Sequence, residues 1–167
     1  MRTRLFSPLS LSVLFSALVL SACAGYSPRE LQPGMSAAQV LESMGPPTAR
    51  HGLPGGATRL EYARGPAGLH TFMVDLDPQG RVAGWQQVLT EAQFNAIPPG
   101  LPVDELRRRL GPPTHVRGGG RQADQVWSYR FDSPFCQWWQ IDITGGRTGA
   151  AAYGADPRCE VNDARPV

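Results

Sequence analysis

The chain has 167 residues, of which 41% are hydrophobic, which is enough for one domain or two small ones with a hydrophobic core. All 16 basic residues are Arg, and they stand against 14 acidic residues. Two Arg and no acidic residue lie in positions 1–22, so the remaining chain carries 14 Arg and 14 acidic side chains. This balance gives no support to nucleic-acid binding, which depends on a basic surface.

The N-terminus has the pattern of an export signal. Arg2 and Arg4 precede an apolar run, residues 11–20, which is shorter than the roughly 20 residues of a membrane-spanning helix. The run ends in Leu-Ser-Ala-Cys at residues 20–23, which resembles the lipobox of bacterial lipoproteins. The resemblance implies a signal peptide over 1–22 and a tether over 23–26 with acyl chains on Cys23, and Ala24 after it implies sorting to the outer membrane. The alternative is an ordinary secretory signal with a cysteine there by chance.

A sixteen-residue stretch occurs twice, at 33–48 and 99–114, with a constant offset of 66. In each copy the apolar residues recur at the spacing of one helix face. Ser36 and Gln39 fit a capping box, and Pro102 fits the first helical position of the second copy. Gly45 and Gly111, each followed by two prolines, fit helix ends. A repeat of this size indicates a duplicated structural unit.

A shorter helix is expected before each copy. Ser27-Pro28-Arg29-Glu30 fits a capping box with proline at the first helical position, and Thr90-Glu91-Ala92-Gln93 opens the counterpart. After each copy comes a glycine-rich segment, residues 52–56 and 118–120. Neither has the Gly-Lys-Ser/Thr ending of a phosphate-binding loop, so we expect flexible connections into a strand.

Three strands are expected in each unit, the third near 81–89 and 148–154. Met73, Asp75 and Asp77 are expected to face away from the core. The aligned inward residues of the first two strands are Leu60 and Tyr62 with Trp127 and Tyr129, and Phe72, Val74 and Leu76 with Trp139, Ile141 and Ile143. The predicted fold is α+β, with tandem ααβββ units over 27–88 and 89–160 and a C-terminal tail over 161–167. In each unit, two short helices pack on an antiparallel meander sheet.

Two cysteines remain beyond the tether. In an exported protein this even pair, Cys136 and Cys159, predicts a disulfide at the open end of two paired strands. A metal site is the alternative, but it would need further His or Cys ligands, and the nearest histidine is His115. We therefore expect neither a metal nor a cofactor.

The sequence gives little indication of catalysis. None of His51, His70 and His115 has a histidine counterpart in the other unit, so all three are expected at the surface. Asp75 and Asp142 are equivalent, and a carboxylate pair for acid–base chemistry is conceivable, although duplication alone explains them. No nucleophile motif is present. We expect no enzymatic activity, no catalytic residues and no small-molecule substrate.

A binding surface is the better prediction. Trp138 and Trp139 are adjacent and therefore point to opposite faces of a strand. Trp139 aligns with the core residue Phe72, so Trp138 is expected on the open face of the sheet, near Arg130, Gln140 and Asp142. Exposed Trp beside Arg is typical of interface hot spots. The alternative is that the first unit or the disulfide loop covers Trp138.

The order of elements, with Pro-Gly-Met at 33–35 and Gly-Pro-Pro at each helix end, resembles the SmpA/OmlA (BamE-like) outer-membrane lipoproteins. The resemblance implies a periplasm-facing binding or scaffold module with a part in outer-membrane assembly or envelope integrity. It would act by contact with other envelope proteins, including the outer-membrane assembly machinery, or with lipid, although family members usually carry one unit. The architecture is also similar to the secreted β-lactamase-inhibitory proteins. That similarity keeps open a binder that inhibits a periplasmic or secreted hydrolase through its sheet face.

Overall fold

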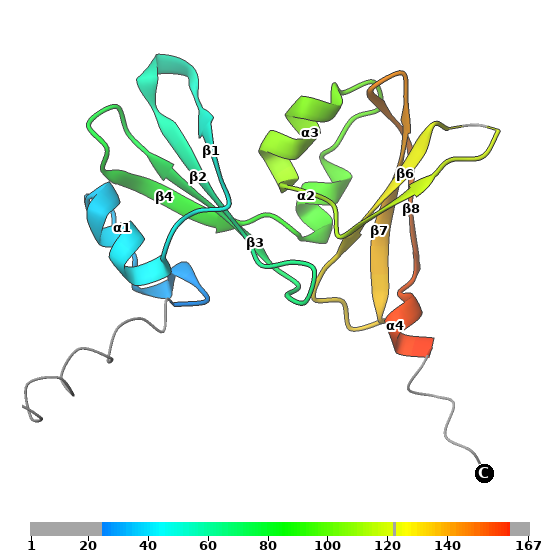
Figure 1. Ribbon diagram of the computed structural model, residues 1–167, viewed down its shortest axis with the longest axis horizontal. Coiled ribbons are helices and arrows are strands. Elements are labelled where there is room, and N and C mark those ends of the chain that lie inside the picture. Colours follow the sequence, from blue (N-terminus) through cyan, green and yellow to red (C-terminus); the bar gives the residue numbers. More distant parts are fainter. Residues whose placement is uncertain (1–24, 122, 161–167) are drawn as a thin grey trace, which may run out of the picture.

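The computed structural model describes residues 25–121 and 123–160, so the predicted signal peptide, Cys23 and the tail over 161–167 lie outside the described residues (Figure 1). The chain forms two four-stranded antiparallel sheets, in the orders β1-β2-β3-β4 and β5-β6-β7-β8. Neighbouring strands follow one another in sequence, so each sheet is a meander. The predicted α+β class is confirmed, but each sheet has four strands instead of three.

The described residues form fourteen short helices and strands, with η marking a 3-10 helix. In chain order they are η2 Pro28–Glu30, α1 Ala37–Met44, β1 Ala49–Gly52, η3 Pro54–Gly56, β2 Thr58–Ala63, β3 Thr71–Leu76, β4 Val82–Gln87, α2 Glu91–Asn95, α3 Val103–Leu110, β5 His115–Gly118, β6 Gln125–Arg130, β7 Gln137–Thr144, β8 Arg147–Ala155 and α4 Pro157–Glu160. Among these described elements, no helix is long and apolar enough to cross a membrane.

The first strand of each sheet was missed in the sequence. β1 and β5 directly precede the glycine-rich segments predicted as flexible connections, sharing only Gly52 and Gly118 with them, and they pair antiparallel with β2 and β6. Their sequences, Ala-Arg-His-Gly and His-Val-Arg-Gly, lack the alternation of large apolar residues that marks a half-buried strand. They are edge strands, formed by pairing with the strand that follows.

The helix-start predictions have mixed outcomes. Ser36 and Gln39 form the predicted capping box, and Thr90 accepts a hydrogen bond from the Gln93 amide. Ser27 makes no cap hydrogen bond, and η2 is a single 3-10 turn. Pro102 is the N-cap residue of α3 and not its first helical residue. The proline still suits this position, because it needs no amide partner there.

The repeated Gly-Pro-Pro motif is explained by structure. Gly45 and Gly111 end α1 and α3 with φ of 75° and 78°, a left-handed conformation that favours glycine. The Tyr62 hydroxyl donates to the Gly45 carbonyl over 3.2 Å, and the Tyr129 hydroxyl donates to the Gly111 carbonyl over 3.4 Å. Burial raises the pKa of Tyr129, so its hydroxyl keeps the proton that it donates. Each glycine is thus tied to the sheet beneath its own helix.

The layers follow from these contacts. α1 covers one face of the first sheet, and α2 and α3 lie between the two sheets (Figure 1). The equivalent residues Val40 and Leu106 are both completely buried, in the first and the second core respectively. All the predicted inward residues of the strands are buried.

The other face of the first sheet is covered by the second half of the chain. Met73 points away from the first core, as predicted, but it is completely buried and belongs to the second core, with Leu106 and Leu110 of α3. Arg59 donates to the backbone carbonyl of Arg108 over 3.4 Å. The end of α3 therefore sits on the first sheet, a contact that the repeat pattern did not predict.

Candidate binding surface on the second sheet

The outer face of the second sheet is the counterpart of the face that α3 covers on the first. An offset of 67 aligns Trp138 and Gln140 of β7 with Thr71 and Met73 of β3. Thr71 is 2% exposed and Met73 is 0% exposed, whereas Trp138 and Gln140 are half-buried. Because α2 and α3 pack on the inner face of this sheet, the described helices leave these residues accessible (Figure 1).

Side chains from β5 and β6 lie against Trp138 of β7. The His115 ring, from β5, stacks parallel to the indole with ring centres 6.2 Å apart. The guanidinium of Arg130, from β6, lies 6.0 Å from the centre of the indole. Trp138 is therefore half-buried by its own sheet, an outcome between the two alternatives that the sequence left open.

Gly154 on β8 completes this arrangement. It pairs with Trp138 across the strands, and a side-chain carbon placed there would lie 3.4 Å from the indole nitrogen and 3.1 Å from the Gln140 side-chain oxygen. The indole therefore lies across the glycine. Gln140 donates to the Ser128 hydroxyl over 3.0 Å, which fixes its amide on the same face.

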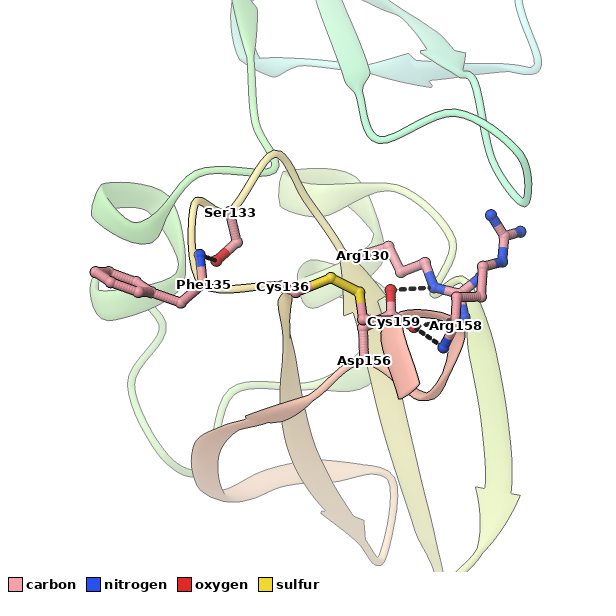
Figure 2. Close-up of a disulfide and its surroundings, with 7 residues drawn as sticks. All are labelled: Arg130, Ser133, Phe135, Cys136, Asp156, Arg158 and Cys159. Carbon is pink, nitrogen blue, oxygen red and sulfur yellow. Dashed lines mark hydrogen bonds and ion pairs between the residues drawn. A yellow bond between two sulfur atoms is a disulfide. The ribbon is translucent and has the colours of Figure 1, made fainter. Parts of the chain in front are cut away.

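Arg130 is held by a carboxylate that the sequence analysis missed. Its Nε and Nη2 donate to Oδ2 and Oδ1 of Asp156 over 2.6 and 2.7 Å, a bidentate pair with both side chains about one-tenth exposed (Figure 2). Asp156 follows the last strand and aligns with Thr90, so neither strand alternation nor the repeat marks it. The pair fixes the guanidinium beside the Trp138 ring.

The predicted disulfide is present and lies beside this ion pair (Figure 2). Cys136 precedes β7 and Cys159 lies in α4, with Cα atoms 6.2 Å apart. The Asp156 amide donates to the Cys136 carbonyl, and the Cys159 amide donates to the Asp156 carbonyl, each over 2.9 Å. The bridge and these bonds hold Asp156 where it meets Arg130.

The other polar candidates have separate structural roles. His51 meets the buried Glu61 carboxylate at 2.9 Å, and Asp75 accepts a bidentate hydrogen bond from Arg59. Asp142 lies on the outer face of the second sheet, opposite Val126. Asp75 and Asp142 thus belong to different sheets, and the conceivable carboxylate pair is not formed.

The ion pair predicts a loss of stability in acid. Burial acts to raise the pKa of Asp156, but hydrogen bonds from the Arg130 side chain and the Arg158 amide, together with both arginine charges, bring it below its ordinary value. The stability that this lowered pKa supplies is present above the unfolded pKa of about 3.9 and disappears as pH falls through the folded pKa.

We therefore expect the free energy of unfolding to fall in acid, and to fall less steeply in Asp156→Asn. At neutral pH this variant is expected to lose about 1–3 kcal/mol, because a charged hydrogen bond is removed. Chemical denaturation at a series of pH values measures both effects. An unchanged slope in the variant would contradict the contribution of the pair.

Neither a protein family, nor a curated protein, nor a solved structure matches the chain. The fold and the surface described above are therefore the grounds on which a function can be argued.

Proposed function

We propose that the protein is a lipid-anchored module of the bacterial outer membrane that faces the periplasm and binds other envelope proteins without catalysis. In this proposal it is a tandem of two BamE-like units, each widened by one edge strand, with acyl chains on Cys23. The outer face of the second sheet is its binding surface, with Trp138 at the centre. The observation that carries the proposal is the equivalence of this face to the one that receives α3 on the first sheet.

The contact between the two halves supports this choice of surface. On the first sheet, the end of α3 lies against the face that carries Thr71 and Met73, and a side-chain carbon at Gly111 would come within 3.0 Å of the Thr71 methyl. The second sheet offers the same face with a tryptophan in place of Thr71. A partner's helix end or loop would bury that indole, and buried Trp beside Arg is the usual composition of a hot spot.

A binding role also agrees with how the polar side chains are used. In the described part of the chain, every buried side-chain nitrogen and oxygen has a hydrogen-bond partner. Arg130 is fixed by Asp156, and Gln140 by Ser128, so these groups are rigid before a partner arrives. Rigid side chains lose little conformational entropy on binding, which favours affinity.

Trp138→Ala tests the surface. A photocrosslinking residue at position 142 of the lipidated protein should capture the partner in cells, and the affinity of that partner is then measured after purification. We expect Trp138→Ala to weaken binding about tenfold or more, because the variant loses the central aromatic contact.

Phe135→Ala is the matched control for loss of an exposed aromatic side chain. Phe135 is 75% exposed and lies in the loop before the disulfide, pointing away from the bridge (Figure 2). This variant should bind as wild type does. Equal affinity of Trp138→Ala and wild type would exclude the surface, whereas capture of a hydrolase that loses its inhibition in Trp138→Ala would favour the inhibitor alternative.

A further inference from the structure

The first core is open at a place where the second is closed. In the second half, the Phe94 ring of α2 stacks on Trp139 with ring centres 4.7 Å apart and planes at 5°. The repeat places Pro28, in the shorter η2, at the position of Phe94, and Phe72 at the position of Trp139. A proline cannot cover as much of the sheet as a phenylalanine ring, so aromatic surface remains accessible around Phe72.

The side chains at this place form a group that we call the aromatic hollow: the buried Phe72, with Tyr26, His70 and Trp85 around it. The Phe72 ring meets the other three, with ring centres 6.2 Å from Tyr26, 5.6 Å from His70 and 6.3 Å from Trp85. Tyr26 is 49% exposed and Trp85 is 41% exposed. Both aromatic side chains therefore present apolar surface to water.

The chain is fixed to the sheet at the edge of this hollow. Arg64 donates from Nη2 to the Gly25 carbonyl over 2.9 Å and from Nε to the Tyr26 carbonyl over 3.0 Å. The Gly25 amide donates to the Ser43 carbonyl over 2.7 Å, and the Tyr26 hydroxyl lies 3.1 Å from Nδ1 of His70. Residues 25 and 26 are thus held by both a helix end and the sheet.

Only one residue separates Gly25 from Cys23. Two residue steps span at most about 7 Å when fully extended. If Cys23 carries acyl chains, the surface around Gly25 and Tyr26 must therefore begin within about 7 Å of the lipidated residue, and so lie close to the membrane. The aromatic hollow is part of that surface, since Tyr26 is one of its members.

The chemistry of the hollow matches the headgroup layer. Trp and Tyr are the side chains enriched at membrane–water interfaces, where the ring is apolar and the polar atom stays hydrated. Arg29 lines the hollow, and the Arg64 guanidinium lies 5.5 Å from the centre of the Tyr26 ring. The acidic neighbours are Glu30 and Glu42, which line a pocket with Arg29, and Asp132, which lines one with Arg64. The two arginines can pair with headgroup phosphates, while the three carboxylates offset their charge, so the aromatic rings supply the main attraction to the headgroup layer.

We propose that the aromatic hollow rests in the headgroup layer of the membrane that holds the lipid anchor, so that the protein is oriented on the membrane. This inference depends on the lipidation of Cys23 in the proposed function. In Figure 1 the described chain begins beside α1, and the second sheet lies at the other end of the long axis. The orientation therefore turns the outer face of the second sheet away from the bilayer and toward periplasmic partners.

Quenching by brominated lipid tests this contact. The full lipidated protein is placed in vesicles of phosphatidylethanolamine and phosphatidylglycerol, with bromine on the acyl carbons near the headgroup. We expect wild-type tryptophan emission to be quenched, and Trp85→Phe to lose the quenched component. The matched variant Trp138→Phe, at the other half-exposed tryptophan, should keep it. Arg29→Glu should reduce the quenching, since a carboxylate is repelled by phosphatidylglycerol.

Flotation of the vesicles separates the two levels of the proposal. A chain that floats with the vesicles carries its anchor, and one that stays behind overturns the lipidation of the proposed function and the orientation with it. A chain that floats, but whose quenching is absent or is unchanged in Trp85→Phe, overturns the orientation alone. Circular dichroism verifies that Trp85→Phe is folded, as expected for a substitution that keeps a ring against Phe72.

Discussion

Replacing Met73 with alanine is expected to lower the free energy of unfolding by about 2–5 kcal/mol, the usual cost of emptying a buried methionine site. Met73 belongs to the first sheet but is completely buried among the residues of the second core. Its side chain is therefore an apolar link between the two halves, and a cavity there weakens the contact between α3 and the first sheet. Urea denaturation measures the loss.

The repeat supplies the control for this experiment. Gln140 holds the equivalent position on the second sheet, where the face is open and the side chain is half-buried. Gln140→Ala removes one hydrogen bond, to Ser128, and should cost about 1 kcal/mol or less. Equal losses for Met73→Ala and Gln140→Ala would mean that α3 does not cover the first sheet in solution.

Much of the fold could be predicted because the helix ends and strand faces have local causes. Ser36 and Gln39 cap α1 through their own side chains, and Gly111 ends α3 because its φ is 78°. The alternation in β6 placed Tyr129 in the core, where it is completely buried. Such features depend on neighbouring residues and so are visible in one sequence.

The burial of Met73 could not be predicted in the same way. Alternation shows that a side chain points away from its own core, but the side chain's environment depends on which distant segment packs there. Glu61, on the same face, is only 4% exposed although it is charged, and His51 and Thr48 supply its partners. The sequence placed this face away from the first core, but it could not show that Gly111 and the rest of the α3 end pack against Met73 and Glu61.

The candidate surface was also predicted in part. Strand alternation alone brought Arg130 and Trp138 to one face. His115 was missed because no strand was predicted at 115–118, and Asp156 was missed because it follows the last strand. The positions of both residues depend on contacts with distant segments. The pairing of β5 with β6 positions His115, and the backbone hydrogen bond to Cys136 positions Asp156.

Removing the disulfide is expected to cost about 3 kcal/mol, because the bridge closes a loop of 23 residues and so restricts the unfolded chain. For a protein of this size, this corresponds to a fall in Tm of about 6–12 °C. Cys136 has a φ of 54°, in the left-handed region. Serine at position 136 is strained by this φ as cysteine is, so the double variant Cys136→Ser, Cys159→Ser measures the effect of the bridge alone. Glycine at position 136 would also relieve the backbone strain.

The same variant should loosen the candidate surface. Without the bridge, α4 is held to the start of β7 only by hydrogen bonds such as the one from the Asp156 amide to the Cys136 carbonyl, so Asp156 positions Arg130 less firmly. Reduction of wild-type protein should reproduce the fall in Tm and leave the double variant unchanged. A wild-type Tm that is insensitive to a reductant, despite complete reduction confirmed by mass, would contradict the role assigned to the bridge.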